Sequence, residues 1–531
     1  MLRIANLRVS IDSDTALAKL AAKRLQLPPQ AVLEVVIVRK ALDARRKTNI
    51  NFVYTLDVRV SVPEGQVLAR LHPDKDVSQT GTNVLPPVCP GSMPLEHQPV
   101  VVGFGPAGML AALTLARYGY RPLVLERGRD VDRRTGDIAR FWQSGILDEL
   151  SNVQFGEGGA GTFSDGKLTT RVNHPAMRDV LDILVEAGAP PEIKYLHKPH
   201  IGTDNLRQVV KNIRKQIIEF GGQVEFEARV TNVVIRDNRL KEVVVNGSRR
   251  IPCTVALFGI GHSARDTYAM LQGCGVAMEA KPFAVGVRIE HPQQLIDQAQ
   301  YGAAAGHPQL PAADYALVYH ARQSERTAYS FCMCPGGMVV AAASEQGGVV
   351  TNGMSHYSRS SQIANSALVV NVGPADFGGK ILGGIEFQRH YEALAYQLAG
   401  CSYYAPVQTV GDFLAGKSGG STFLTQPSYR PGVTPADLAQ CLPGYVTAAL
   451  REALPEFGRK IRGFDDKSAV MTGVETRTSA PVRMVRTDEF VSVNTGGFYP
   501  VGEGAGYAGG IMSAALDGLT AAKAVIGRYK V

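Results

Sequence analysis

The sequence predicts an α/β fold: a discontinuous domain of sheet and helices, a β-rich domain inserted into it, and a small α/β domain before both. Three observations predict it. Residues 97–128 follow the order apolar run, glycine turn, helix, apolar run, and a strand, glycine loop and helix return near the C-terminus. Between these two regions the pattern is mostly strand-like. At 531 residues the chain is too long for one compact core, so two or three domains are expected.

The first part of the chain, residues 1 to about 62, has the pattern of a small α/β unit. A helix is expected from Asp14 to Leu25, and strands are expected at Arg3 to Ser10, Ala31 to Lys40 and Asn51 to Val60. Repeated prolines and glycines follow and predict a linker. We therefore assign residues 1–94 to this unit and its linker.

Residues 97–128 carry the most specific signal in the chain. Gly103 permits a tight turn, Gly105 lets backbone N–H groups approach a pyrophosphate, and Gly108 lets the following helix pack closely on the strand. Glu126 lies 18 residues after Gly108, at the end of the second strand, where a carboxylate can accept hydrogen bonds from ribose hydroxyls. The spacing predicts a Rossmann-like dinucleotide site.

The chain then passes through a glycine-rich segment into strands that complete the first half of this domain. Five glycines between Phe155 and Lys167 exclude a helix or a central strand and predict a loop that lies flat on a planar ligand. The pattern then predicts a helix and a three-stranded meander, followed by a strand that re-enters the sheet: Asn205 to Phe220, Val224 to Phe226, Val230 to Arg236, Leu240 to Val245, and Thr254 to Phe258.

Domain boundaries follow from where the pattern changes. From Phe283 to about Tyr404 turn signals separate short strands, as in an antiparallel domain. Near the end, a strand at 497–501 and a loop at 502–506 lead into a helix at 510–526. We expect a nucleotide domain made of residues 95–282 and 466–531, with residues 283–465 inserted as a substrate domain.

Composition and charge indicate the compartment of the protein and the partners to expect. The net charge of +8 comes from scattered basic residues, and such mild basicity does not indicate nucleic acid. No apolar run is long enough for a membrane span, and charges near the N-terminus interrupt any signal peptide. Seven cysteines without zinc-ribbon spacing fit free thiols in a reducing compartment. We expect a cytoplasmic protein that binds neither membranes nor nucleic acid.

The nucleotide fingerprint is followed, near the C-terminus, by a strand, an acid-glycine loop and a helix. With this combination the chain resembles the flavoprotein superfamily of glutathione reductase and p-hydroxybenzoate hydroxylase. Within it, four segments resemble a bacterial family of uncharacterised FAD-dependent dehydrogenases over essentially the whole chain: residues 156–168, 261–266, 281–288 and 475–479. The resemblance implies FAD as the cofactor and leaves the substrate unassigned.

By position, the resemblance assigns parts of FAD to particular residues. Glu126 would hold the adenosine ribose, Arg134 a phosphate, Val230 the adenine, and Glu503 the ribityl or pyrophosphate region. N–H groups at the start of the last helix could stabilise negative charge on the reduced flavin. The full set of expected cofactor contacts is Gly103, Gly105, Pro106, Ala107, Gly108, Glu126, Arg127, Arg134, Gly158, Gly159, Thr162, Val230, Gly261, Gly502, Glu503, Gly504, Gly510, Ile511 and Met512.

Polar residues in the loops expected around the flavin are the catalytic candidates. They are Asp165, Lys167, His262, Arg265 and Arg477, and each also has an alternative role as a structural contact. Cys332 and Cys334 alternate along a strand, which places both thiols on one face in a geometry that suits a disulfide badly. A buried pair is the default interpretation, with a thiol facing the flavin as the alternative.

Three further motifs have competing interpretations. Residues 411–418 satisfy the P-loop expression, but Gly419 and Gly420 follow the lysine where a P-loop needs a helix, so we reject an ATP site. Residues 259–264 read GxGxxA after a strand and could form a second dinucleotide site for NAD(P)H, although a contact with FAD is favoured. His197 and His200 are separated by a proline and lack further nearby ligands, so no metal is expected.

The sequence thus predicts an enzyme, a FAD-dependent oxidoreductase of the dehydrogenase type that exchanges a hydride or electron pair with an organic substrate. One alternative is a flavoprotein reductase that uses NAD(P)H at residues 259–264. Another is a flavin-bearing binding module whose basic N-terminal unit docks RNA or a protein.

Overall fold

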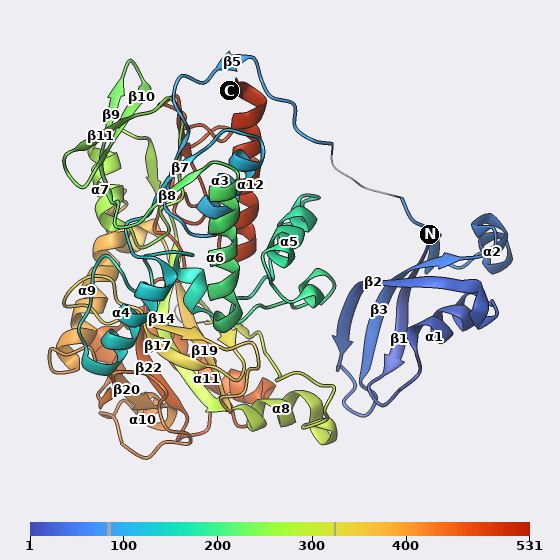
Figure 1. Ribbon diagram of the computed structural model, residues 1–531. Helices are drawn as coiled ribbons and strands as arrows, with labels where there is room; N and C mark the ends of the chain where they lie inside the picture. The colour runs from blue at the N-terminus through green and yellow to red at the C-terminus, as the bar shows by residue number, and fades with distance from the viewer. Residues whose placement is uncertain (82–85, 323–324) are drawn as a thin grey trace.

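The computed structural model describes residues 1–81, 86–322 and 325–531 (Figure 1). Residues 82–85, which fall in the expected linker, lie outside this description. Within the described residues, every helix is too short or too polar to cross a membrane.

A five-stranded parallel sheet, in the order β24-β12-β6-β7-β8, forms the centre of the nucleotide domain. Each of its three middle strands is a run of three fully buried apolar residues, as expected of a parallel sheet covered on both faces. The strands are β6 (Val100–Val102), β7 (Leu123–Leu125), β8 (Gln223–Glu225), β12 (Ala256–Phe258) and β24 (Phe498–Pro500).

Two helices from opposite ends of the chain pack side by side against this sheet (Figure 1). Helix α3 (Pro106–Arg117) follows β6, and its proline occupies the first turn, where a missing N–H costs nothing. Helix α12 (Ile511–Arg528) follows β24. The sheet and its helices therefore confirm the predicted Rossmann-like fold.

The remaining elements of this domain agree with the prediction except in the meander. We expected residues 224–226 to be its first strand, but β8 pairs in parallel with β7, and the meander is β9 (Val230–Arg236), β10 (Arg239–Val245) and β11 (Arg249–Pro252). The first strand was misassigned because β8 is too short for its periodicity to show its partner. The helices are α4 (Val131–Ser144), α5 (Met177–Glu186), α6 (Thr203–Glu219) and α7 (Arg265–Gly273).

The inserted domain is built on a seven-stranded sheet in the order β15-β16-β19-β14-β22-β20-β21. It is antiparallel except for β20 and β21, as the turn signals predicted. We expected residues 466–531 to belong to the nucleotide domain, whereas β22 lies inside this sheet. The strands are β14 (Phe283–Pro292), β15 (Val318–His320), β16 (Thr327–Cys334), β19 (Ile363–Val372), β20 (Ala405–Thr409), β21 (Val433–Pro435) and β22 (Val470–Glu475).

Helices and two small ribbons complete this part of the molecule. The helices are α8 (Gln293–Tyr301), α9 (Gly383–Leu398), α10 (Val410–Ala415) and α11 (Gly444–Lys460). One ribbon pairs β17 (Met338–Ala341) with β18 (Thr351–Met354), and the other pairs β13 (Met278–Ala280) with β23 (Val482–Met484).

The N-terminal unit is a separate four-stranded antiparallel sheet in the order β2-β3-β1-β4. Alternation along β3 buries every second residue, which is the pattern that predicted the strand. The sequence analysis missed helix α2 (Glu64–Leu71), which begins directly after Pro63 in what we took for linker. The other elements are β1 (Leu2–Ser10), α1 (Leu17–Arg24), β2 (Val32–Asp43), β3 (Asn51–Val60) and β4 (Val77–Gln79).

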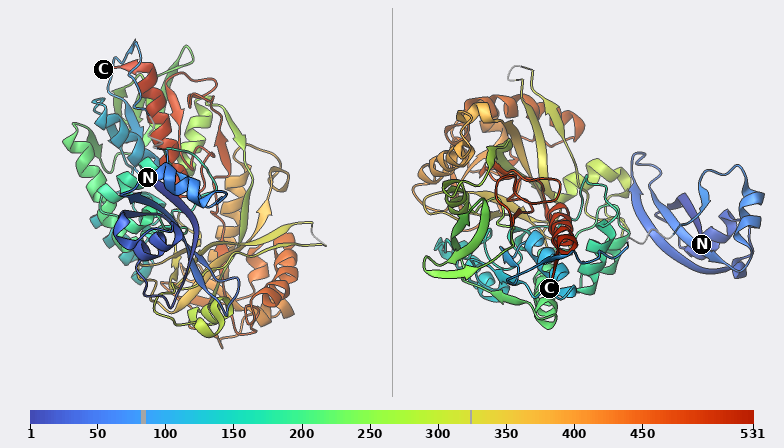
Figure 2. Two further views of the ribbon diagram at one scale, coloured as in Figure 1. Left: turned by 90° about the vertical axis from the view of Figure 1, so that its right-hand side faces the viewer. Right: turned by 90° about the horizontal axis from the view of Figure 1, so that it is seen from above.

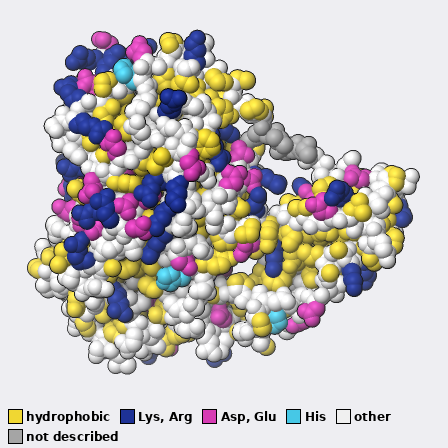
Figure 3. Space-filling model, in the orientation of Figure 1, with side chains coloured by type: hydrophobic (Ala, Val, Ile, Leu, Met, Phe, Trp, Pro, Cys, Tyr) yellow, Lys and Arg dark blue, Asp and Glu magenta, His cyan; other side chains and the backbone are white. Residues whose placement is uncertain are grey.

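This unit stands to one side of the rest of the protein (Figures 1 and 2). It meets the larger part through the outer edge of β2, where the backbone of Lys40 donates to Tyr195 O and accepts from His197 N. Farther along the chain, β5 (Met93–Pro94) pairs with β25 (Tyr529–Lys530). On the face seen in Figure 3, Lys and Arg side chains are intermingled with Asp and Glu.

Candidate functional site

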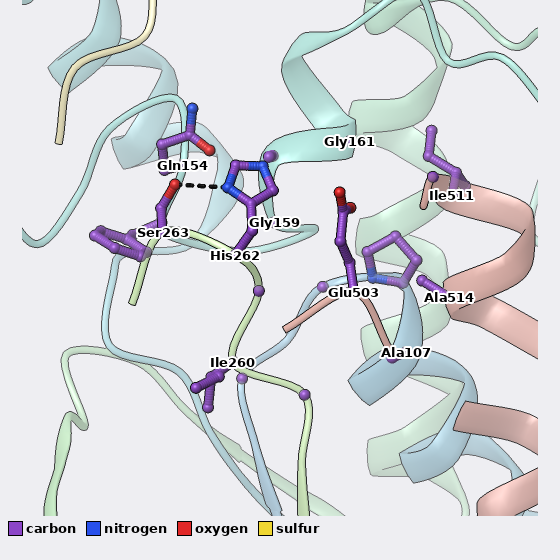
Figure 4. A pocket seen from close by; sticks show the side chains of 18 of the residues that line it. Ala107, Gln154, Gly159, Gly161, Ile260, His262, Ser263, Glu503, Ile511 and Ala514 are labelled. Atoms are coloured by element: carbon purple, nitrogen blue, oxygen red, sulfur yellow. Dashed lines mark hydrogen bonds between the residues drawn. The ribbon is translucent and has the colours of Figure 1, made fainter. Parts of the chain in front are cut away.

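A cavity of about 370 Å³ opens where the nucleotide domain meets the inserted sheet. Its walls are the turns after β6 and β12, the first turns of α3 and α12, the loop from Gln154 to Thr169, and residues of β16, β18 and β22. Figure 4 shows His262 and Glu503 projecting into the space between the Gly159 to Gly161 loop and the start of α12. Parts of the chain far apart in sequence thus share one site.

Glycines allow two stretches of backbone to approach closely at one end of the cavity. A Cβ atom added to Gly159 would lie 2.9 Å from the Cα of Gly105, closer than side chains tolerate. A Cβ on Gly105, in contrast, would meet only the Cα of Gly159, at 3.7 Å, so the space that a side chain would occupy is open. Behind them, a Cβ on Gly108 would lie 1.9 Å from the carbonyl oxygen of Gly103. The open space at Gly105 and the close contact at Gly108 fit the roles predicted for these two glycines, and the φ of +90° at Gly103 fits the tight turn predicted there.

Glu126 is a buried carboxylate at the cavity wall. Its Oε2 accepts from the backbone N–H of Phe104 at 2.8 Å, and its Oε1 accepts from the N–H groups of Gly128 and Gly156 at 2.9 and 3.0 Å. The acid therefore joins the end of β7 to the turn before α3 and to the glycine loop. Sequence spacing placed Glu126 at the site but did not indicate this structural role.

The structure places Arg134 behind the cavity wall, whereas we expected it beside a phosphate of the cofactor. Its guanidinium is fully buried and donates to four carbonyl oxygens, those of Asn152, Val153, Gly156 and Glu157. Burial, partly offset by the charges of Glu126 and Glu157, lowers the pKa of Arg134 to about 9. The arginine organises the glycine-rich loop from behind, because α4 points its side chain away from the cavity.

The other expected cofactor contacts fall into two groups. The first lines the cavity: Gly103, Gly105, Pro106, Ala107, Glu126, Arg127, Gly159, Val230, Gly261, Glu503, Gly510 and Ile511. The second, besides Arg134, lies behind the wall and acts through packing: Gly108, Gly158, Thr162, Gly502, Gly504 and Met512. At Gly158, for example, an added Cβ would be 1.9 Å from the Thr162 hydroxyl. Motif membership alone could not separate the two groups.

Glu503 lies on the cavity wall beside the start of α12. Burial raises the pKa of Glu503 to about 7, although the charge of Lys281 opposes that shift. The first turns of α3 and α12 both reach the cavity, and each helix end offers unpaired N–H groups and a partial positive charge. An anionic, phosphate-bearing ligand therefore fits this end of the site.

His262 is linked to Arg477 through Ser263. Arg477 Nη1 donates to the Ser263 hydroxyl at 3.1 Å, and that hydroxyl forms a hydrogen bond with His262 Nδ1, 2.9 Å away (Figure 4). Burial, assisted by the charges of Arg477 and Arg265, lowers the pKa of His262 to about 3. His262 is therefore a neutral imidazole that lines the cavity.

Arg265 and Arg477, two catalytic candidates, belong to one buried ion cluster. Both donate to the two carboxylate oxygens of Glu392 on α9, and Arg265 also pairs with Glu345. Burial would raise the pKa of Glu392, but the two arginines outweigh it and hold the pKa well below its usual range. Only Arg477 reaches the cavity wall. Arg265 lies behind it in the ion cluster, a position that favours the alternative role as a structural contact.

Asp165 and Lys167 do lie on the cavity wall. Both oxygens of Asp165 accept from Arg359, at 3.2 and 2.7 Å, and Lys167 Nζ is 3.8 Å from Asp165 Oδ2. Cys332 joins them from the inserted sheet. The expected alternation of Cys332 and Cys334 is broken by a bulge between Phe331 and Cys334, so Cys332 lies at the cavity and Cys334 in the core.

The structure also bears on the three competing motifs. Helix α10 ends at Ala415, before the lysine of the P-loop expression, which agrees with its rejection. After β12 and α7 the chain enters β13, which pairs with β23 instead of joining the parallel sheet, so residues 259–264 do not begin a second βαβ unit. Residues 259–263 line the same cavity as Gly105. His200, one of the two histidines considered for a metal, forms a hydrogen bond through Nε2 with the backbone oxygen of Tyr357. The seven cysteines form no disulfide with one another.

Known proteins show what this chain is similar to. Residues 282–478 match the family described as FAD-dependent protein, C-terminal domain-like, and residues 1–59 match a domain of unknown function, DUF8436. An uncharacterized protein of Clostridium beijerinckii is 50% identical over 530 residues, which is 99% of each chain.

Two solved structures are similar to this chain at low sequence identity. Glycine oxidase from Bacillus cereus has 8% identity and a TM-score of 0.36, with 81% of this chain and 95% of the oxidase covered. CtdE in complex with FAD has 12% identity and a TM-score of 0.33, with 80% and 83% covered.

The family match and the site agree on the cofactor. The glycine cradle leaves room where a Cβ would otherwise lie, two helix ends suit a diphosphate, and Glu126 borders the cavity at the strand end where a ribose binds. FAD is therefore the cofactor that the residues fit and the family match names. The chain is a FAD-dependent flavoprotein and belongs to the same family as the C. beijerinckii protein.

Proposed function

We propose that this protein is a FAD-dependent oxidoreductase of the dehydrogenase type, acting on an organic small molecule held against the inserted sheet. One observation carries the proposal. A single cavity extends from the nucleotide turn at Gly105 to Phe331, Cys332 and Asn352 of the inserted domain. A ligand anchored at the turn thus shares its space with side chains from a second domain, an arrangement typical of substrate sites.

When bound, FAD supplies the exchange of an electron pair, and the protein supplies binding, orientation and charge. Residues of the cavity wall can supply the protein's part of this chemistry. His262 lines the cavity as a neutral imidazole, and Glu503, with a pKa of about 7, can hold or release a proton near neutral pH. Lys167 adds positive charge from the glycine loop.

Electron donors other than NAD(P)H are favoured by the topology. Because β13 leaves the parallel sheet, residues 259–264 contribute to the FAD cavity and not to a nucleotide fold of their own. We expect the second substrate to be organic, and we keep reduction by NADH or NADPH as an outcome of the test.

The purified protein should show flavin absorption, and FAD should be released on denaturation. Under anaerobic conditions, NADH and NADPH should bleach the flavin slowly or not at all, whereas members of a panel of organic donors, including alcohols, amines and hydroxy acids, should bleach it in seconds. Rapid bleaching by a pyridine nucleotide would contradict the choice of donor. A flavin that chemical reductants bleach but no organic or nucleotide donor can reduce would favour the binding module and refute the oxidoreductase.

A further inference from the structure

Asn352, on β18, lies on the cavity wall with its side-chain amide held in one orientation. Its Oδ1 accepts from Arg288 Nη2 at 3.2 Å and from the backbone N–H of Gly353 at 2.7 Å. Because neither of these N–H groups can accept a hydrogen bond, the positions of the amide oxygen and nitrogen are determined. The Nδ2 group has no hydrogen-bond partner within residues 1–81, 86–322 and 325–531, and it is not sealed from solvent. It is a free donor at the cavity wall.

Arg288 is the fully buried residue that holds Asn352 in this orientation. Its Nε and Nη2 donate to the two carboxylate oxygens of Glu475 at 3.0 Å. Its Nη1 donates to the carbonyl oxygen of Cys332 and to Asn365 Oδ1, both at 3.0 Å. The guanidinium thus connects β14, β16, β19 and β22 beneath the cavity. A donor supported in this way is preorganised for a ligand, since little freedom remains to be lost on binding.

Other polar side chains of the inserted domain on this wall are already bonded to the protein. Glu475 and Arg477 belong to the ion pairs described above. The Thr478 hydroxyl donates to the carbonyl oxygen of Ala284 and accepts from its N–H, both at 3.0 Å. Asn352 is therefore the amide donor that a ligand meets where the cavity reaches the inserted sheet.

Two cations share the carboxylate of Asp165 at this end of the cavity. Both oxygens of Asp165 accept from Arg359, and Lys167 Nζ lies 3.8 Å from Oδ2. The stem of Lys167 lines the cavity while its Nζ is shielded from solvent, so its charge acts on the cavity without touching a ligand. Two cations against one carboxylate leave a net charge of +1 beside the cavity.

The remaining charges near this end cancel in pairs. Glu475 is paired with Arg288, and the charge of Lys281 acts on Glu503. In the buried ion cluster around Arg477, each arginine has a glutamate partner. The excess positive charge beside Asp165 therefore remains, and it favours an anionic ligand in a cavity with low-dielectric walls.

We propose that this end of the cavity is a carboxylate subsite, in which Asn352 Nδ2 donates a hydrogen bond to a carboxylate oxygen of the substrate. The positive charge beside Asp165 stabilises the bound anion. The inference rests on the proposed function and deepens it by naming an organic acid as the substrate class. Asn352 is then a residue that determines specificity, because a buried donor discriminates against ligands that leave it unpaired.

Benzoate and benzamide test the subsite, because they have nearly the same size and shape and differ in charge. Each is titrated into the FAD-loaded protein, in which the cofactor occupies the helix ends that could also attract an anion. Isothermal titration calorimetry gives the Kd, and a change in the visible absorption of the flavin reports binding in the cavity. Benzoate should bind at least ~10-fold more tightly than benzamide, since a hydrogen bond to a charged acceptor is the stronger one.

Variants identify the groups responsible. Asn352→Leu removes the donor and should weaken benzoate binding by ~10-fold or more. Asn352→Asp keeps an acceptor for Arg288 but places a carboxylate against the ligand, so benzamide should now bind more tightly than benzoate. Lys167→Met should weaken the binding of benzoate and leave that of benzamide unchanged. Asn173→Leu, at an exposed asparagine outside the cavity wall, is the matched control and should change neither. FAD content and melting temperature check that each variant is folded.

The subsite is refuted if the wild-type protein binds benzoate no more tightly than benzamide, or if folded Asn352→Asp keeps the wild-type preference. A protein that binds benzoate through Asn352, but whose flavin no organic donor reduces, would refute the proposed function and leave the subsite standing. Rapid reduction by alcohols or amines without a carboxylate, in a protein that does not bind benzoate, would refute the subsite alone. The two failures are therefore distinguishable.

Discussion

Replacing Gly105 with alanine should separate cofactor binding from folding. The backbone of Gly105 has φ −79°, which alanine adopts without strain, and the added Cβ would meet only Gly159 Cα at 3.7 Å, an ordinary contact. The free energy of unfolding of the FAD-free protein should therefore change by less than about 0.5 kcal/mol. The same methyl group enters the space where a pyrophosphate approaches the backbone.

Crowding in a packed site costs about 1–3 kcal/mol, so the Kd for FAD should rise about 5- to 150-fold. Gly105→Val should abolish retention. Titration of FAD-free protein with FAD, together with thermal unfolding without FAD, measures both quantities. Gly136→Ala, at an exposed helical glycine with open space around it, is the control that should leave the Kd for FAD unchanged, while the better helix former raises the free energy of unfolding by up to about 1 kcal/mol. Unchanged FAD affinity in Gly105→Val would refute the assignment of this turn.

Three further predictions follow from buried groups and chain connections. Glu126→Ala should destabilise even the FAD-free protein by about 3 kcal/mol or more, because three backbone N–H groups lose their acceptor; a loss confined to FAD affinity in denaturant titrations would contradict this. Deleting residues 1–81 should leave a folded protein that binds FAD. Deleting residues 1–94 also removes the pairing of β5 with β25 and should lower the melting temperature further. Equal melting temperatures for the two deletions would show that this pairing does not stabilise the fold. Burial raises the pKa of Glu290 to about 7, so the folded state binds this proton more tightly than the unfolded state does. The free energy of unfolding should therefore fall by up to about 3 kcal/mol as the pH rises from about 4.5 to 7. Thermal melts of Glu290→Gln over the same pH range should lack this decrease.

Residue patterns predicted the nucleotide domain well because local rules determine it. The β6 turn, α3 and Glu126 follow one another within about one βαβ unit, and each position has a steric or hydrogen-bonding reason for its residue type. The seven-stranded sheet was predicted as a class, but the place of β22 within it was not. Strand partners depend on contacts far apart in sequence, which periodicity cannot reveal.

Sequence patterns predicted part of the site, as they predicted part of the fold. Sequence motifs placed most glycines at the cavity, but they did not predict which way side chains point. Arg265, within the motif at residues 261–266, and Arg134, shortly after the nucleotide fingerprint, both point behind the wall. Asn352 was missed, since it comes from a short ribbon strand of the inserted domain without any motif signal. A bulge of one residue decided the position of Cys332, and alternation assumes that bulges are absent.

The placement of α12 beside α3 has a consequence for how the protein is made. Strand β24 and helix α12 leave the ribosome long after β6 and α3, yet they complete the sheet and one wall of the cavity. Until they emerge, α3 lacks its neighbour and its apolar residues remain uncovered. The N-terminal unit can fold early in synthesis, whereas the cofactor pocket can close only after β24 and α12 have been made. A growing chain therefore carries a finished first domain and an unfinished second one until α12 has emerged, and the complete cavity for FAD exists only after that point.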